Sequence, residues 1–233
     1  MAVQLNGNRM NDNTVIKKSF FNQLNSALRS NIRSIIIVLS LFFAIFLIFQ
    51  IYSVYSSNKI KNNSIVFFNN QNLEDQNSIS KTIQELSNQS GFYGILSKLE
   101  LIEKHIKNKN YGSVESIYDE LLTNKKLNKI YKSAIATKAS YEFIDINFSN
   151  LSKDYNKTIK NFISSIDDEL INYEGVKLEL SYLTAILNIE KNNLNYLNGN
   201  EAIDLYDNIM SSDVASSSIK ERVNKIHEYY TYK

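Results

Sequence analysis

One uninterrupted apolar run near the N-terminus constrains the fold more than any other feature of the chain. From Ile35 to Val54 the only polar residues are two serines and one glutamine, and none is charged. A helix of about 20 residues rises by roughly 30 Å, which matches the hydrocarbon core of a bilayer. A buried strand would end after about eight residues. The run therefore predicts a membrane-spanning helix over residues 35–54, with its anchoring side chains at Ile35, Val38, Phe42, Ala44, Phe46, Phe49 and Val54.

The same run fits a cleaved secretion signal less well. The apolar part of a signal is usually about 7–15 residues long and is followed by a small-x-small cleavage pattern. Here the run is longer, residues 1–34 precede it, and no clear pattern of that kind follows. We therefore expect the helix to remain in the mature protein as an anchor.

Basic residues are unequally distributed about the anchor and predict its orientation. Residues 1–61 contain seven of the 26 Lys and Arg residues but one of the 24 acidic residues, which leaves 19 basic and 23 acidic residues in the rest of the chain. Lysine and arginine close to a spanning helix resist translocation. The head, residues 1–34, is therefore predicted to be cytoplasmic, and the body to lie in the periplasm of a bacterium. The acidic body argues against nucleic acid as a partner.

The head carries a helical pattern of its own. Ile16, Phe20 and Leu24 fall on one side of a helix at 100° per residue, and Lys18, Arg29 and Arg33 fall on the other. A basic amphipathic helix of this kind binds the anionic surface of a membrane. Extension of the anchor, or packing on another protein, stays open as an alternative. Ser40 and Ala44 form a small-xxx-small pair, which leaves helix pairing, and with it a homo-oligomer, open as well.

The rest of the chain predicts an all-α fold. A polar linker is expected over residues 55–64 and a helical domain over 65–233. Proline, which ends helices, is absent. Phe92, Leu99 and Ile106 recur at helical spacing, and a second stripe contains Val114 and Tyr118, so these two segments predict an antiparallel hairpin around a turn at Gly112. Further helices are expected near residues 152–166, 168–190, 200–210 and 215–230.

The segment 124–147 predicts a long helix with two apolar stripes. One stripe contains Leu127, Ile130, Tyr131 and Ala134, and the other contains Ile135, Ala139, Phe143 and Ile146. A helix that is apolar on more than one side is usually packed between neighbours. We therefore expect both stripes to be buried.

Two segments repeat each other. SVESIYDELL (113–122) matches EAIDLYDNIM (201–210), and Val114 aligns with Ala202 and Tyr118 with Tyr206. A turn that contains Asn and Gly precedes each segment, with Gly199 in the second. Repeated helical hairpins indicate a stacked solenoid, because neighbouring units bury each other's apolar faces.

The order of short head, single anchor and helical hairpins resembles the membrane-anchored TPR-like family typified by the ancillary subunit of the bacterial SecYEG translocon. The local similarity lies in FYGILSKLELIEKHIKNKNYGSVESIYDELLTN and in the following KIYKSAIATKASYEFID. Ser97, Val114 and Ser133 stand where such repeats usually carry alanine. The resemblance implies a TPR-like solenoid whose partners are translocon subunits, chaperones or nascent chains.

No catalytic, cofactor or metal site is predicted. Cysteine is absent, and His105 and His227 are the only histidines and fall on different predicted helices, at the flanks of their apolar stripes. No glycine pattern of a phosphate-binding loop occurs. The abundant tyrosines are assigned mainly to the core, with a minority able to contact a peptide. A non-enzymatic protein-interaction module is the leading hypothesis. A ligand-sensing receptor and a scaffold for cell division or envelope assembly are the alternatives.

Overall fold

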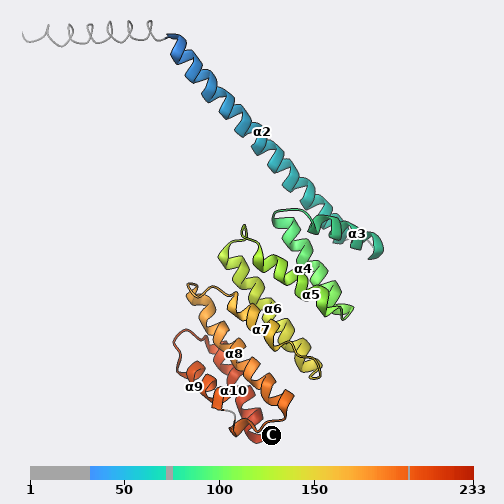
Figure 1. The fold of residues 1–233 in the computed structure, drawn as a ribbon, viewed down its shortest axis with the longest axis vertical. Coiled ribbons are helices and arrows are strands. Elements are labelled where there is room, and N and C mark those ends of the chain that lie inside the picture. Colours follow the sequence, from blue (N-terminus) through green and yellow to red (C-terminus); the bar gives the residue numbers. More distant parts are fainter. Residues whose placement is uncertain (1–31, 72–75, 199) are drawn as a thin grey trace, which may run out of the picture. The chain divides into compact units, whose positions relative to one another are not determined.

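The computed structural model describes residues 32–71, 76–198 and 200–233 of the chain (Figure 1). Within these residues every regular element is helical, which confirms the predicted all-α class. The predicted amphipathic helix of the head lies outside the described residues, as does Gly199. The elements are α2 (Ile32–Gln71), α3 (Gln76–Ser87), α4 (Phe92–Lys107), α5 (Tyr111–Thr123), α6 (Lys129–Ser149), α7 (Asn156–Ser164), α8 (Ile171–Asn192), the 3₁₀ turn η1 (Tyr196–Asn198), α9 (Asn200–Ser211) and α10 (Ser217–Tyr232).

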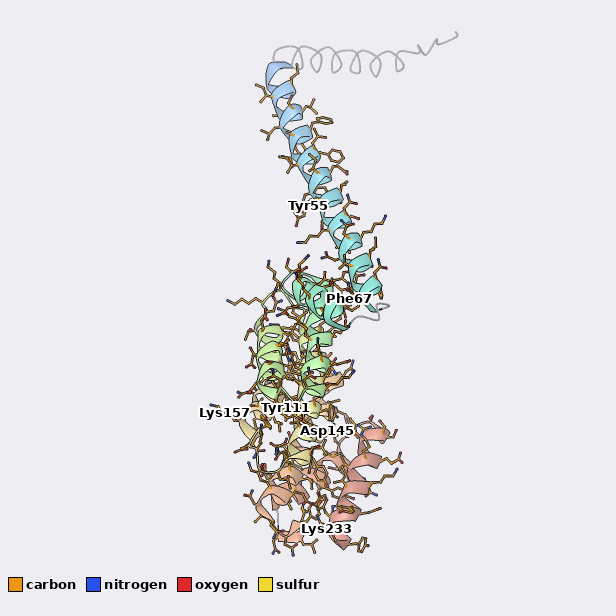
Figure 2. The ribbon with its side chains drawn as sticks, turned by 90° about the vertical axis from the view of Figure 1, so that its right-hand side faces the viewer. Tyr55, Phe67, Tyr111, Asp145, Lys157 and Lys233 are labelled. Atoms are coloured by element: carbon orange, nitrogen blue, oxygen red, sulfur yellow. The ribbon has the colours of Figure 1, made fainter. Side chains whose placement is uncertain are left out.

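The chain divides into two compact units, Met1–Asn72 and Leu73–Lys233. The described part of the first unit is the single helix α2, which is 40 residues long. Its stretch Ile36–Asn70 is long and apolar enough to cross a membrane. Figure 2 shows side chains projecting from α2 along its length, with Tyr55 labelled part-way along it.

The apolar run predicts a polar linker after Val54, but α2 continues through residues 55–64 and ends at Gln71. This part of the chain contains neither proline nor glycine, so nothing in it interrupts the backbone hydrogen bonds of the helix. The predicted helical domain starts at residue 65, whereas the compact unit starts at Leu73. The predicted linker is thus a continuation of the helix α2.

The second unit is a succession of helices in which each packs against the next. Contacts join α3 to α4, α4 to α5, α5 to α6, α6 to α7, α7 to α8, α8 to α9 and α9 to α10. In addition, α6 packs against α8, and α8 packs against α10, so these three alternate helices form a row. The hairpin predicted for residues 92–122 is present as α4 and α5.

The core of the second unit consists of two apolar clusters. The first gathers buried side chains from α4 to α8, including Tyr118, Phe143 and Phe162. The second lies among α8, η1, α9 and α10, and includes Tyr182 and Val223. Every helix from α4 to α10 therefore contributes apolar area, whose burial is the main stabilising contribution to folding.

Asparagine and serine side chains begin several of these helices. Asn110, Asn128 and Ser216 accept hydrogen bonds from backbone N–H groups in the first turns of α5, α6 and α10, which satisfies donors that have no partner within the helix. The turn before α5 differs from the prediction. Gly112 lies in the first turn of α5, and Lys109 is the residue with a positive φ, of 54°. In this turn it is therefore a lysine that adopts the left-handed conformation.

One of the two stripes predicted for the 124–147 helix is wrong. Ile135, Ala139, Phe143 and Ile146 are buried. Of the other stripe, Leu127 lies before α6 and is half-buried against the first core cluster, whereas Ile130, Tyr131 and Ala134 are exposed. The helix α6 is contacted by α5, α7 and α8, and no described element covers its first turn on this side. The exposed stripe is therefore an apolar surface rather than core.

Two glycines are required where backbones approach each other closely. A Cβ atom at Gly175 of α8 would lie 2.6 Å from the carbonyl oxygen of Val214, in the loop between α9 and α10. A Cβ atom at Gly94 of α4 would lie 1.9 Å from the carbonyl oxygen of Gln89. In both places a methyl group would overlap with backbone, so the two helices depend on glycine for their spacing from the adjoining loops.

Candidate functional site

A buried carboxylate joins the three helices of the row. The side chain of Glu179 on α8 is only 3% exposed. Its Oε2 accepts a hydrogen bond of 2.7 Å from the hydroxyl of Tyr141 on α6, and Nε and a terminal nitrogen of Arg222 on α10 donate to its two oxygens, each at 2.7 Å. The single carboxylate therefore connects α6, α8 and α10.

The geometry explains why a carboxylate is tolerated in the interior. An unpaired buried charge is very costly, but a planar guanidinium matches both carboxylate oxygens at once. The hydrogen bond to Glu179 raises the pKa of Arg222. Burial, followed by the hydrogen bond to Glu179, raises the pKa of the Tyr141 phenol well above its usual range. Arg222 stays charged and Tyr141 stays a hydrogen-bond donor at neutral pH.

A second polar network joins α5 to α6. Tyr118 is fully buried, and its hydroxyl donates to Oε2 of Glu142. The other oxygen of Glu142 accepts from Nζ of Lys138, one turn earlier on α6. Burial, followed by the hydrogen bond to Glu142, raises the pKa of Tyr118 far above its usual range. This tyrosine is a fixed donor that ties the first hairpin to the next helix.

In these two networks the polar side chains bind each other across helices. Each carboxylate is engaged by a cation and a phenol, so neither is free to act as a general base. The side chain of Arg222 is nevertheless 53% exposed and that of Lys138 is 40% exposed. Both remain accessible to a protein or peptide that approaches α6 and α10, and arginine beside tyrosine is a frequent combination in protein interfaces.

The two histidines are half-buried and have different surroundings. His227 on α10 lies in an aromatic cluster: the hydroxyl of Tyr196 is 2.7 Å from its Nδ1, and the ring of Tyr206 stacks on it at a centroid distance of 3.8 Å. No group of three or more metal-binding side chains occurs in residues 32–71, 76–198 and 200–233. His227 therefore has a packing role among η1, α9 and α10.

One concavity opens at the C-terminal end of the unit. It has a volume of about 360 Å³, and Glu190, Tyr196, Tyr230 and Lys233 are among its lining residues. Lys233 pairs with Glu190 at 2.5 Å across it. The charged groups at its rim are therefore paired with each other, and the hydroxyl of Thr231 in its lining donates to the carbonyl oxygen of His227.

The predicted anchor residues all lie on the described part of α2. Val38, Phe42, Phe46, Phe49 and Val54 are exposed, as is Ala44. Ile35 belongs to the helix. None of the apolar window of this segment is buried.

The residues predicted to pack the repeats are mostly in the core. Val114, Tyr118, Ala139 and Ala202 are buried. Tyr206 is half-buried, and its hydroxyl donates to Oδ1 of Asn224 at 2.8 Å. Ala134 is exposed and belongs to the incorrectly predicted stripe.

Sequence reasoning missed Glu179 and Arg222. A signal was present, because Glu179 follows Leu178 and precedes Leu180 within a helix that is otherwise apolar at these positions. A lone carboxylate in such a stretch predicts a buried ion pair. Its partner, 43 residues later in the chain, could not be chosen from the sequence because α10 contains two further cationic side chains, those of Lys220 and Lys225.

No protein-family model, curated protein or solved structure matches this chain.

Proposed function

We propose that the chain is a non-enzymatic, membrane-anchored protein whose helical body is a TPR-like interaction module. One observation carries the proposal: the apolar side chains of α2 from Ile36 to Val54 are exposed, and none of the apolar window of this helix is buried. Such a surface is stable in lipid and unstable in water. The spanning helix would then hold a compact helical unit next to the membrane.

The packing order of the second unit supports a TPR-like arrangement. The pairs α4–α5, α6–α7 and α8–α9 are hairpins, and one member of successive pairs forms the row α6, α8, α10. In a solenoid each repeat contacts mainly its neighbours. The repeated motif occupies equivalent places, since Tyr118 on α5 bonds to α6 and Tyr206 on α9 bonds to α10.

The charge distribution supports an orientation with the head in the cytoplasm and the body in the periplasm. Lys17, Lys18, Arg29 and Arg33 precede the anchor closely, whereas Lys59 and Lys61 follow it. We therefore propose a single-pass protein of the bacterial inner membrane. Protease added outside spheroplasts would digest the body, and survival of the body would contradict this orientation.

The resemblance to the ancillary translocon subunit suggests the partner. The body would bind translocon subunits, periplasmic chaperones or emerging polypeptides through its helical surface. The exposed parts of Arg222 and Lys138 offer charged contacts for such a partner.

In-cell crosslinking of the full chain tests this proposal. A photo-crosslinking residue placed at Asn62, Lys81 or Lys104, all exposed, would capture translocon subunits. The same residue at exposed Glu201 of the last hairpin is the matched control. Capture of unrelated membrane complexes only, or equal yields from all four positions, would contradict a specific translocon contact. A large rise in melting temperature with one metabolite would favour the receptor alternative instead.

A further inference from the structure

The first turns of α6 and α8 expose large apolar side chains at one edge of the second unit. Ile130 is 54% exposed, Tyr131 is 61% exposed and Ile171 is 71% exposed. Single exposed apolar residues are common on protein surfaces, but three on adjoining elements form a patch.

Hydrogen bonds and ion pairs hold these two first turns together. The backbone N–H of Asp167, in the loop before α8, donates to the hydroxyl of Ser133 on α6 at 3.0 Å. Nζ of Lys129 lies 3.1 Å from a carboxylate oxygen of Asp167 and 2.7 Å from one of Glu169. Ile171 follows Glu169 by two residues, so it extends the edge formed by Ile130 and Tyr131.

The edge is also basic. The segment KKLNKIYK, residues 125–132, contains four lysines and no acidic residue. Of the three carboxylates that precede Ile171, Asp167 and Glu169 share Lys129, and Asp168 pairs with Lys177. No ion pair involves Lys125, Lys126 or Lys132 among the described residues. Three cationic side chains therefore remain unpaired beside the exposed apolar ones. We call Lys125, Lys126, Ile130, Tyr131, Lys132 and Ile171 the basic edge.

This combination of side chains fits a lipid surface better than a protein surface. Lysine is depleted in protein interfaces, whereas lysine together with aliphatic residues and tyrosine is typical of segments that bind the headgroup layer of a membrane. Anionic headgroups also supply the negative charge that the three unpaired lysines lack.

We propose that the basic edge docks the body onto anionic lipid headgroups. This inference rests on the proposed membrane anchor, because α2 would keep the body close to the bilayer and give the edge an effective lipid concentration far above that of a free protein. The docked state would have Tyr131 and Ile130 at the level of the headgroups and the three lysines against phosphates. The anchor and the basic edge are then two separate contacts with one membrane.

The chain contains no tryptophan, which permits a direct test in the full-length protein. Tyr131→Trp introduces a single reporter at the basic edge. The protein is reconstituted in nanodiscs of zwitterionic phosphatidylcholine, or of phosphatidylcholine with phosphatidylglycerol or phosphatidylserine, with brominated acyl chains as quenchers. We expect a blue shift and quenching in both anionic compositions and neither effect in the zwitterionic one.

Neutralisation of the three lysines tests whether they make the contact with the headgroups. Lysines near an anionic surface each contribute roughly a five-fold change in binding, about 1 kcal/mol, so Lys125→Gln, Lys126→Gln and Lys132→Gln together reduce docking on the order of 100-fold and abolish the quenching. The matched control replaces three exposed lysines elsewhere, Lys107→Gln, Lys157→Gln and Lys160→Gln, and retains it; Lys157 is labelled in Figure 2. High salt also removes the quenching, because it screens exposed charges.

Three outcomes overturn the inference. They are equal emission in all compositions, equal quenching of a Tyr232→Trp reporter at the 87% exposed C-terminal end, and retention of quenching in the triple lysine variant of the basic edge. Circular dichroism confirms that each variant is folded. Carbonate extraction separates this inference from the proposed function: a released protein contradicts the anchor itself, whereas an anchored protein without quenching contradicts only the docking.

Discussion

The first and last hairpins of the body solve the same packing problem with different chemistry. Both α5 and α9 carry the repeated motif, and in both a tyrosine hydroxyl bonds to the following helix. On α5, Tyr118 is fully buried and bonds to the carboxylate of Glu142. On α9, Tyr206 is half-buried and bonds to the neutral amide of Asn224 at 2.8 Å.

The difference shows how one motif can serve two environments. Tyr118 lies in the first core cluster with helices on several sides, and its ring packs edge-on against Phe162 at a centroid distance of 5.7 Å. Tyr206 lies near the end of the stack and gains a stacking contact with His227 instead. The last hairpin also relies on the Glu179–Arg222 pair between α8 and α10. The repeated tyrosine therefore matters more to stability in the first hairpin than in the last.

Removal of the two aromatic rings gives the largest expected difference. Tyr118→Ala leaves a buried cavity and should lower the free energy of unfolding by ~4 kcal/mol, whereas Tyr206→Ala at a half-buried site should lower it by ~2 kcal/mol. Urea denaturation of the detergent-solubilised full chain, followed by circular dichroism, measures both. Tyr229→Ala, at an exposed position, is the control and should change stability by less than about 0.5 kcal/mol. Equal losses for the two hairpins would contradict the comparison.

Replacement of Arg222 is expected to lower stability more than replacement of its partner Glu179. Arg222→Ala leaves a carboxylate that is almost fully buried without its cation and should cost ~3 kcal/mol. Glu179→Ala should cost less, ~1–2 kcal/mol, because the half-exposed guanidinium can turn toward water. The same denaturation assay measures both variants. A double replacement, Glu179→Leu with Arg222→Met, should recover most of the loss, and failure to recover it would show that the pair contributes more than charge compensation.

Removal of the two tyrosine hydroxyls alone should give a smaller difference in the free energy of unfolding between the two hairpins. Tyr118→Phe loses a hydrogen bond to a charged acceptor and should cost ~1.5 kcal/mol, whereas Tyr206→Phe loses one to a neutral amide and should cost ~0.5–1 kcal/mol. Double-mutant cycles with Glu142→Ala and Asn224→Ala measure each coupling directly. A coupling energy for Tyr206 as large as that for Tyr118 would argue against the distinction between charged and neutral acceptors.

The smallest expected effects concern pH. Burial, followed by repulsion from Glu103, raises the pKa of Glu100 on α4, and its Oε2 is buried without a partner. A raised carboxyl pKa stabilises the fold fully below the unfolded value, 4.5, and the contribution is lost as the pH rises through the folded pKa. Glu100→Gln should therefore raise the melting temperature at pH 7 by ~1–2 °C, with no gain below about pH 4.5.

Glu190 on α8 should show the opposite sign. The hydrogen bond from Lys233 is the main cause that lowers its pKa. Its contribution is present above the unfolded value and is lost as the pH falls through the folded pKa. Glu190→Gln should lower the melting temperature at pH 7 by ~1 °C, and the difference should vanish in acid. Melting curves from pH 3 to pH 8 check both variants, and effects of the same sign would contradict the assignment.

The all-helical class was predictable from the sequence because apolar spacing and the absence of proline are local properties. The predicted segments 168–190 and 200–210 correspond closely to α8 (Ile171–Asn192) and α9 (Asn200–Ser211). The solenoid, the partner and the compartment stay predictions. The repeat correctly placed Val114 and Ala202 in the core, since burial follows the periodicity of a helix that packs on one side.

The predictions from the sequence were wrong or incomplete where the packing of distant segments determines the outcome. Both stripes of the segment 124–147 are apolar, and only the positions of the neighbouring helices determine that Ile130 and Tyr131 are exposed. Gly112 was expected in a turn because glycine is permissive, but the positive φ falls on Lys109. The pairing of Glu179 with Arg222 spans 43 residues. Helical periodicity does not predict which side chains meet over such a separation.

The continuity of α2 has a mechanical consequence. A chain that leaves the bilayer as a flexible tether decouples whatever lies beyond it, whereas an unbroken helix transmits torsion. With 40 residues at ~1.5 Å each, α2 extends ~60 Å, about twice the hydrocarbon thickness. In the proposed membrane-anchored arrangement, a turn of the membrane-embedded half about its own axis would reappear as the same turn at Gln71, at the other end of the helix.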